Sequence, residues 1–312
     1  VTLTVTTGSQ VSEDTQVITI YDVPTVAPIV ELKQCDNNLD GFSIFNLTEV
    51  NAEISVNHLN ETIMFYETQV DAESGGTSNL ILNEAAYPNQ QVSTDMVWAR
   101  IENSNGCFKT SQVNLIVSNT QIPLNFTRYF YECDDGTDTN DGIATFNFSS
   151  LSSEIQALFP VGQQLIINYY RNQADALSEN NPITDITNYQ NIGYPNTQDI
   201  YIRVDSALNN DCLGLGQHIT LYVEEKPLST GPIIIEQCDV ANDGVEAIDT
   251  STINAELLQG QTNVSLTFTD AMGNVLSNPL PNPLITGSQA ITVVMTNTAS
   301  QDPDGTCSEW TT

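Results

Sequence analysis

The chain has 312 residues, with 39 Asp and Glu against 7 Lys and Arg, so its formal net charge is -32 and its pI is near 4.1. This balance argues against nucleic acid and anionic membrane as partners, because both are bound through clustered Lys and Arg. Apolar residues make up 40%, enough for sizeable cores, and no apolar run is long enough to predict a membrane-spanning helix.

The first predicted strand is the alternating stretch V-I-T-I-Y at residues 17–21. It matches stretches at residues 113–117 and 219–223, each of which follows the second cysteine of a repeat. Residues 1–24 are therefore interpreted as the tail of a preceding repeat. The sequence opens on Val1 with neither Met nor a signal peptide, and we expect it to be a piece of a longer chain.

A Cys-Asp…Asp-Gly pattern then occurs three times, each time after an apolar run. The copies begin at Cys35, Cys133 and Cys238, which are 98 and 105 residues apart. The spacing predicts β-sandwich repeats at residues 25–121, 122–226 and 227–312, the last of them C-terminally truncated.

Within each repeat, short β-branched and aromatic runs alternate with polar residues and are separated by Gly, Asn, Asp and Pro. This pattern predicts antiparallel strands. One short helix per repeat is expected at residues 48–55, 150–158 and 251–258, each opened by a Ser or Thr that can cap it. A unit of about 100 residues with some seven strands indicates an all-β fold of tandem immunoglobulin-like β-sandwiches.

Six cysteines, two per repeat, predict disulfides and an oxidising, extracellular setting. Pairing across the linkers would join cysteines 26 residues apart, but it would leave Cys35 and Cys307 unpaired. Pairing within repeats uses all six and is preferred, which gives Cys35–Cys107, Cys133–Cys212 and Cys238–Cys307. Zinc is not expected, because the chain has no Cys-x-x-Cys and only two histidines.

The acidic loops after the first cysteines resemble half of a calcium loop, because oxygen ligands alternate before a glycine. Residue 47, where an EF-hand needs Glu, is Leu47, so no EF-hand is predicted. Ca²⁺ binding and a simple Asx-rich turn remain open as alternatives, the turn being slightly favoured. The candidate ligands are Asp36, Asn38, Asp40, Asp134, Asp138, Asn140, Asp141, Asp239, Asn242 and Asp243.

Arg100 and Arg203 occupy equivalent strand positions in a chain with few other cations. A structural pair with an acidic neighbour, such as Asp71 or Asp175, is favoured over contact with a ligand. Aromatic residues of the predicted strands could stack on sugars, but core positions are favoured for Phe65, Tyr66, Trp98, Tyr169, Tyr170 and Tyr201. No nucleophile, metalloprotease or phosphate-loop motif occurs, and acid pairs are uninformative among 39 acidic residues, so no catalytic residue is predicted.

The combined pattern resembles the repeats of giant Bacteroidota surface proteins that are exported by the type IX secretion system, of which gliding-motility adhesins are the best known. The pattern is Cys-Asp…Asp-Gly-x-x-x-Phe-Asn, then Tyr-Tyr-x₄-Asp-Ala, then Ile-Tyr-Ile-Arg-Val…Cys. It is clearest from Cys133 to Val223, and the third copy lacks the Tyr-x₄-Asp-Ala and the arginine.

This resemblance implies a non-catalytic, filamentous adhesin segment at the cell surface, associated with the outer membrane and supporting attachment or gliding motility. The implied partners are the secretion and motility machinery and an unknown surface or glycan ligand. Asp205-Ser206-Ala207 also matches the O-glycosylation acceptor of this phylum, with Ser206 as the acceptor. The alternatives are an array of carbohydrate-binding modules and the spacer region of a secreted enzyme.

Overall fold

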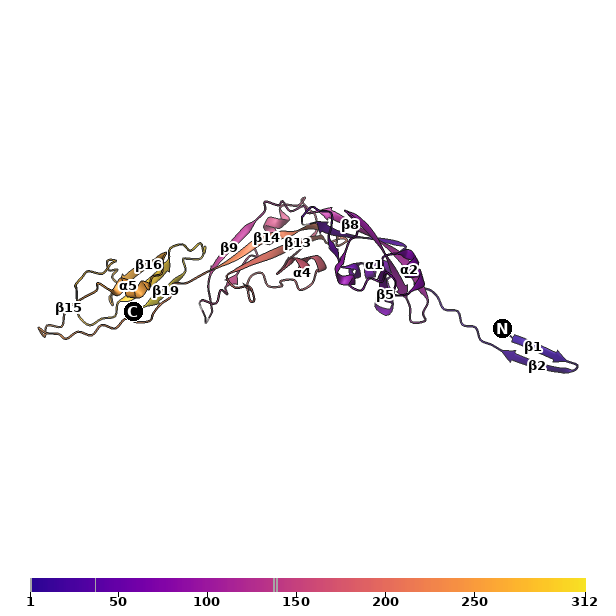
Figure 1. The fold of residues 1–312 in the computed structure, drawn as a ribbon, viewed down its shortest axis with the longest axis horizontal. Coiled ribbons are helices and arrows are strands. Elements are labelled where there is room, and N and C mark those ends of the chain that lie inside the picture. Colours follow the sequence, from indigo (N-terminus) through magenta and orange to yellow (C-terminus); the bar gives the residue numbers. More distant parts are fainter. Residues whose placement is uncertain (1, 37, 137, 139) are drawn as a thin grey trace.

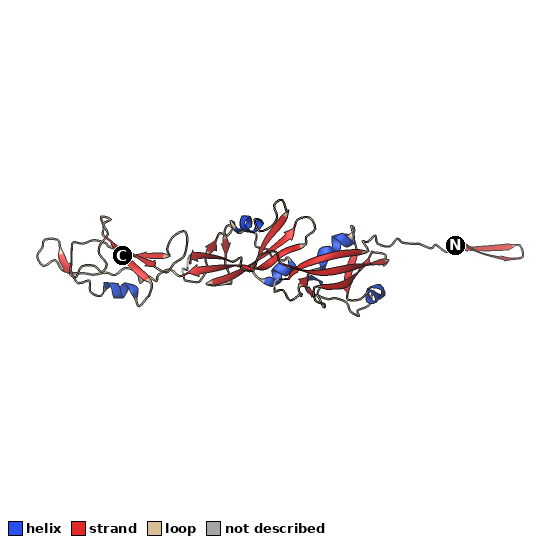
Figure 2. Ribbon diagram, turned by 90° about the horizontal axis from the view of Figure 1, so that it is seen from above, coloured by secondary structure: helices blue, strands red, loops and turns tan. Residues whose placement is uncertain are grey.

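The structure is a computed structural model that describes residues 2–36, 38–136, 138 and 140–312. It is a row of units along one long axis, with an N-terminal hairpin at one end and the third repeat at the other (Figures 1 and 2). The hairpin consists of β1 (Thr2–Thr7) and β2 (Gln10–Thr15), and an extended segment leads from it to the first repeat. No helix in the described part of the chain is long and apolar enough to cross a membrane.

The first repeat has a four-stranded sheet in the order β3-β8-β7-β5. Its strands are β3 (Ile29–Asp36), β5 (Thr62–Tyr66), β7 (Thr94–Glu102) and β8 (Phe108–Asn119). A second, small layer pairs β4 (Ile44–Phe45) with β6 (Tyr87–Pro88). The helices are short: η1 (Leu47–Val50), α1 (Asn51–Ile54), η2 (His58–Asn60), α2 (Gln69–Ser74) and η3 (Glu84–Ala86).

The second repeat copies this arrangement, with the sheet order β11-β13-β14-β9. Its strands are β9 (Arg128–Cys133), β11 (Leu165–Tyr170), β13 (Thr197–Ser206) and β14 (Cys212–Glu224). The small layer pairs β10 (Thr145–Phe146) with β12 (Tyr189–Gln190), and the helices are α3 (Leu151–Gln156) and α4 (Gln173–Ser178).

The third repeat has a three-stranded sheet in the order β16-β18-β19. The strands are β16 (Val264–Thr269), β18 (Thr292–Asn297) and β19 (Ser308–Thr311). β15 (Glu246–Ile248) pairs with β17 (Leu284–Thr286), and α5 (Ile253–Leu258) is the one α-helix among the described residues of this repeat.

Alternating side chains build a core in each repeat, as period-two strands require. In the first repeat Phe45 and Phe65 are fully buried together with Leu115, and in the second Phe146 and Ile202 take part in the same way. The prediction of tandem all-β immunoglobulin-like sandwiches is confirmed. The expectation of purely antiparallel strands is wrong, because β3 runs parallel to β8 and β9 runs parallel to β14.

The short helices lie close to where the sequence predicts them, at α1, α3 and α5. The first two repeats contain a second α-helix that the sequence analysis missed, α2 and α4. Thr68 and Asn172 open these helices, and the side chain of each accepts a hydrogen bond from the backbone N–H three residues later.

Candidate functional site: the disulfide-closed joints between repeats

The disulfides connect different repeats. Cys35 is bonded to Cys212 and Cys133 to Cys307, with Cα atoms 5.4 Å apart in both pairs. Cys107 and Cys238 are free thiols. The predicted pairs Cys35–Cys107, Cys133–Cys212 and Cys238–Cys307 are therefore wrong, and the first cysteine of one repeat pairs with the second cysteine of the next.

Strand geometry explains why pairing within a repeat fails. Cys133 lies beside Glu224 at the end of β14, whereas Cys212 opens the same strand. β14 has 13 residues, which at about 3.3 Å per residue separates its ends by about 40 Å. A disulfide needs Cα atoms less than about 7 Å apart. The two cysteines of the second repeat therefore lie at opposite ends of it. Cys212 bonds to the first repeat, and Cys133 bonds to the third.

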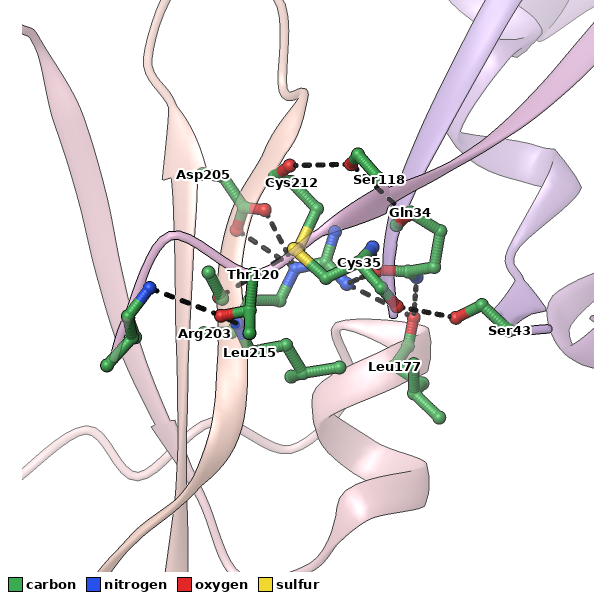
Figure 3. Close-up of a disulfide and its surroundings, with 12 residues drawn as sticks. Gln34, Cys35, Ser43, Ser118, Thr120, Leu177, Arg203, Asp205, Cys212 and Leu215 are labelled. Atoms are coloured by element: carbon green, nitrogen blue, oxygen red, sulfur yellow. Dashed lines mark hydrogen bonds and ion pairs between the residues drawn. A yellow bond between two sulfur atoms is a disulfide. The ribbon is translucent and has the colours of Figure 1, made fainter. Parts of the chain in front are cut away.

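A fully buried arginine lies beside the first disulfide (Figure 3). Its Nε donates to both carboxylate oxygens of Asp205, at 2.9 and 3.0 Å, and its Nη2 lies 2.5 Å from Glu179. Nη1 of this residue, Arg203, donates to Oε1 of Gln34 in the first repeat at 2.9 Å and to the carbonyl of Ala176 at 3.1 Å. The guanidinium therefore links the two repeats through the planar, multidentate geometry that lysine lacks.

Gln34 completes this contact from the first repeat. Its Nε2 donates to the carbonyl of Leu177 at 2.8 Å and to that of Ile44 at 3.1 Å. Gln34 is 2% exposed, so the hydrogen bonds replace the water that burial removes. At the rim, the ammonium of Lys33 lies 2.8 Å from the carboxylate of Asp211. The joint thus combines an ion pair at its rim, a buried polar network and a covalent bond.

Acidic groups outnumber the arginine in this joint. Burial, then the nearby charges of Glu179 and Asp205, raise the pKa of Glu49 to about 8, although Arg203 opposes the shift. Burial raises the pKa of Asp205 to about 7 against the opposing effect of the guanidinium. With three carboxyls around one cation, the joint holds a proton near neutral pH.

The arginines pair as the structural interpretation predicts, but with different acids. Asp71 and Asp175 do not contact them, because each carboxylate accepts from side chains within its own helix and turn. Arg100 instead donates to Glu102 at 3.1 Å and to backbone carbonyls of α2, and it stacks on Phe108.

The second joint, between the second and third repeats, contains a group of carboxylates and has no arginine at the position of Arg203. Val294 occupies the strand position of Arg203, and Glu132 precedes the joint cysteine where the first repeat has Gln34. One carboxylate oxygen from each of Glu132, Asp302 and Asp304 lies within 4.8 Å of the other two. Burial, followed by repulsion from Asp302 and Asp304, raises the pKa of Glu132 to about 7.

Glu224 organises this joint through backbone contacts. Its carboxylate accepts from the N–H of Gln301 at 2.8 Å and from that of Asp302 at 3.2 Å, and the hydroxyl of Ser300 also donates to it. The N–H of Cys133 donates to Asp302 at 3.0 Å. Asp302 thus bonds directly to the second repeat beside the disulfide.

The acidic loops form Asx turns. Both oxygens of Asp36 accept backbone N–H groups, from Leu39 at 2.6 Å and Gly41 at 2.7 Å among others. Asp239 accepts from Asp243 and Gly244 in the same way. Asp134 accepts from Gly142 through one oxygen, and its other oxygen is buried without a hydrogen-bond partner among the residues that the structure describes.

The remaining calcium candidates also act locally. Asp40, Asp138 and Asp141 accept backbone N–H groups two residues ahead, as does Asp243, and Asn38 donates to Asp40. Asn140 and Asn242 lie exposed in these loops. The groups of three His, Cys, Asp or Glu side chains that converge among the described residues lie at the second joint and not in the loops. Ca²⁺ binding stays a prediction.

Four of the six aromatic residues are core residues, as the favoured interpretation predicts. Phe65, Tyr66, Tyr169 and Tyr170 are at most 2% exposed, and Trp98 and Tyr201 are half-buried. The four buried rings therefore offer no open face for a sugar. Ser206 is half-buried at the end of β13, where its hydroxyl accepts from the N–H of Leu208.

Sequence reasoning missed Gln34, Glu49, Glu179 and Glu224. Gln34 had a usable signal, because it directly precedes the first cysteine and the third copy has Gln237 at the same position. Glu49, Glu179 and Glu224 had no such signal in the sequence. They are 3 of 39 acidic residues, and they come close to one another or to the joints only when the repeats dock.

No curated protein matches this sequence. Several solved structures resemble it at low scores. A human CDH23 EC21-23 structure has 9% identity and a TM-score of 0.17, with 93% of this chain and 99% of that one covered. A 1.5-MDa bacterial ice-binding adhesin structure has 9% identity and a TM-score of 0.22, with 80% and 83% covered.

A Bacteroides ovatus glucan-utilization protein, SGBP-B, in complex with a mixed-linkage heptasaccharide has 12% identity and a TM-score of 0.17, with 94% and 70% covered. Such low TM-scores support no conclusion about this chain. A family model is decisive instead, because it matches residues 31–123 and 129–227, and its description names the bond found at both joints. The chain belongs to the Flavobacterium inter-domain disulphide bond domain family.

Proposed function

We propose that this chain is a non-catalytic, load-bearing segment of an extracellular adhesin fibre, which supports attachment or gliding on a surface. The observation that carries the proposal is the route of the covalent chain through the first joint. The backbone enters the first repeat on β3, reaches Cys35, crosses to Cys212 and leaves the second repeat along β14. Two strands and one disulfide therefore span both repeats.

Tension applied at the ends follows this short route. The 177-residue separation between Cys35 and Cys212 encloses most of both repeats in a closed loop. An open chain of that length would extend by about 600 Å on unfolding, at about 3.4 Å per residue. The disulfide withholds that extension, so a fibre built this way stays short under load. A tether between a cell and a surface needs that property.

The setting fits this role. Structural disulfides persist in oxidising compartments, so we place the chain outside the cell, at the cell surface. Type IX secretion and the motility machinery are the proposed export route and partner. The high negative charge favours solubility.

Single-molecule pulling from the two ends tests the mechanical proposal. With the disulfides intact, we expect the total contour-length gain to be less than half of that measured after reduction by dithiothreitol. Equal gains in both states would overturn it. In the native host, the C35S/C212S variant should detach from glass at lower shear than cells with the unaltered protein, and unchanged detachment would overturn the adhesive role.

A further inference from the structure

The first disulfide is completely buried. Cys35 and Cys212 are 0% and 2% exposed, and they belong to one apolar cluster with Tyr170, Leu177 and Leu215. Tyr170 comes from β11 and Leu177 from α4, so a strand and a helix of the second repeat close over the bond (Figure 3). A thiol in solution cannot reach either sulfur atom while this cluster stays packed.

The second disulfide is open on one side. Cys307 is buried, but Cys133 is half-buried. The Cys133 sulfur lies 3.9 Å from the carbonyl oxygen of Gly305, at the surface of the joint, whereas the Cys212 sulfur makes its corresponding contact with Gly214 in the interior. A thiol can therefore approach the second bond from the side of Cys133 while both repeats stay folded.

Smaller side chains and a different connection explain this opening. The ladder between β11 and β13 ends with Tyr170 paired to Tyr201, and the ladder between β16 and β18 ends with Thr269 paired to Thr292. After β11 the second repeat continues into α4, whereas after β16 the third repeat makes a turn at residues 270–274. The aromatic rings and the helix that cover the first bond are thus replaced by two threonines and a turn.

Trp310 gives independent evidence of this opening. It lies three residues after Cys307, just as Leu215 lies three residues after Cys212. Leu215 is buried in the cluster around the first disulfide, whereas Trp310 is 68% exposed. The strand that follows the second disulfide therefore presents to solvent a large side chain at a position that its counterpart buries.

Carboxylates surround the open bond. One carboxylate oxygen of Asp302 lies within 4.8 Å of both sulfur atoms, those of Cys133 and Cys307. A carboxylate oxygen of Glu224 lies 3.6 Å from the Cys307 sulfur. Negative charge at this distance attracts a cationic thiol and repels an anionic one such as glutathione.

We propose that the second disulfide, Cys133–Cys307, is reduced in the folded chain by small cationic thiols, whereas the first, Cys35–Cys212, stays closed until the repeats separate. The thiolate of the reductant attacks the Cys133 sulfur, the bond between the two cysteines breaks, and Cys307 leaves as a thiolate that takes a proton from water. A second reductant molecule attacks the mixed disulfide and releases Cys133. Two small thiols are thereby oxidised to one disulfide, and their two electrons reduce the protein bond.

Reduction of this kind would loosen the row at one joint only. The third repeat would stay attached through its linker and the hydrogen bonds of Glu224, and the first two repeats would stay bonded to each other. The inference does not depend on the load-bearing role, since it concerns only the access of a thiol to two bonds.

Reduction kinetics of the full chain test the proposal. The starting protein is the C107S/C238S variant, because it keeps both disulfides and removes the free thiols that could exchange with them. It is incubated with cysteamine at pH 8, alkylated at intervals and analysed by peptide mass spectrometry. We expect the cysteines of the second disulfide to be labelled at least tenfold faster than those of the first, and the two pairs within twofold of each other in urea.

Two outcomes of this experiment would contradict the inference. Equal rates in the folded chain would show that burial does not protect the first bond. A tenfold difference that persists in urea would show that the difference resides in the local sequence and not in the packing.

The choice of thiol tests the role of the carboxylates. The rate with cysteamine is divided by the rate with glutathione at the second disulfide, in the folded chain and in urea. We expect this ratio to be at least threefold larger in the folded chain, and we expect sodium chloride to reduce the excess by screening. A ratio that is the same in both states would overturn the preference for cationic thiols.

A matched pair of leucine variants tests the cover over the first bond. Leu177→Ala opens the apolar cluster and should accelerate reduction of the first disulfide at least fivefold, while the second changes less than twofold. Leu208→Ala replaces a side chain that is 80% exposed and should change neither rate. If Leu177→Ala accelerated both bonds equally, general unfolding and not the cluster would set the rates, and the inference would fail.

Discussion

Cys35, near the end of β3 in the first repeat, is bonded to Cys212, which opens β14 in the second. The bond lies beside the buried hydrogen bond from Arg203 to Gln34, so the covalent and polar contacts hold the same surfaces together (Figure 3). The linker, the disulfide and this network connect the repeats at adjacent positions, because Ser118 before the linker lies beside Cys35 and donates to the Cys212 carbonyl. A joint with three attachments resists bending, which a single linker does not.

Removing the first disulfide should loosen that joint. We expect the C35S/C212S variant to lose about 2–5 kcal/mol of stability, the usual cost of deleting a native disulfide. Small-angle scattering should show a wider distribution of molecular lengths, because one attachment is lost. The C107S/C238S variant is the control, since neither thiol is bonded in this structure. Identical scattering from both variants would show that the polar network alone sets the angle between repeats.

Replacing Arg203 should destabilise the joint more than replacing an exposed arginine. Arg203→Met leaves Asp205 and Glu179 without their buried cation, and we expect a loss of about 3–5 kcal/mol in unfolding free energy. Arg128→Met is the matched control, because its ion pair with Glu154 is 41% exposed on both sides and should contribute less than about 1 kcal/mol. Calorimetric unfolding of both variants compares them. Similar losses would contradict a dominant role for the buried cation.

The fold could be predicted from the sequence because the same pattern of alternating strands and turns occurs in three repeats. Alternation in runs such as residues 219–223 specifies a buried face, and turn residues mark the ends of the strands. It could not specify that β3 runs parallel to β8, because periodicity carries no direction. That direction places Cys35 at the far end of its repeat from Cys107. The predicted disulfide Cys35–Cys107 is wrong for this reason.

The arginines show the same limit at smaller scale. Their equivalent strand positions predicted a structural pair, and the structure contains one at each. The acids of these pairs, Glu102 and Asp205, lie two residues after each arginine on the same face of the strand, so alternation could indicate them. Gln34 could not be predicted, since it lies 169 residues from Arg203 and becomes its neighbour only when two repeats dock. Contacts between repeats depend on tertiary geometry that local patterns do not encode.

The joint should also respond to pH. The pKa of Glu49 is raised to about 8 in the folded chain from 4.5, so the folded state binds a proton more tightly than the unfolded state does. The resulting stability is fully present below about pH 4.5 and is lost as the pH rises through about 8. Asp205, with a pKa of about 7, acts in the same direction. We therefore expect the melting temperature to fall between pH 5 and pH 9.

Glu49→Gln provides the control for this titration. It keeps the size of the side chain and removes the titrating group, so the decline in melting temperature between pH 5 and pH 9 should become shallower. Glu53→Gln changes an exposed acid one helical turn away and should leave the decline as it is. A decline of equal steepness in all three proteins would assign the pH response to other groups.

The loop after Cys35 offers a test that separates a turn from a metal site. Asp36 accepts three backbone N–H groups, from Asn38, Leu39 and Gly41, and it is buried. Asp36→Ala would leave these donors unpaired, and we expect a loss of about 1–3 kcal/mol. Asp239→Ala should cost less, because Asp239 is exposed and water can replace it.

Since backbone donors already occupy both oxygens of Asp36, EDTA should leave the melting temperature of the unaltered chain unchanged. A rise of several degrees on adding Ca²⁺, abolished by Asp36→Ala, would instead establish calcium as a ligand of this loop.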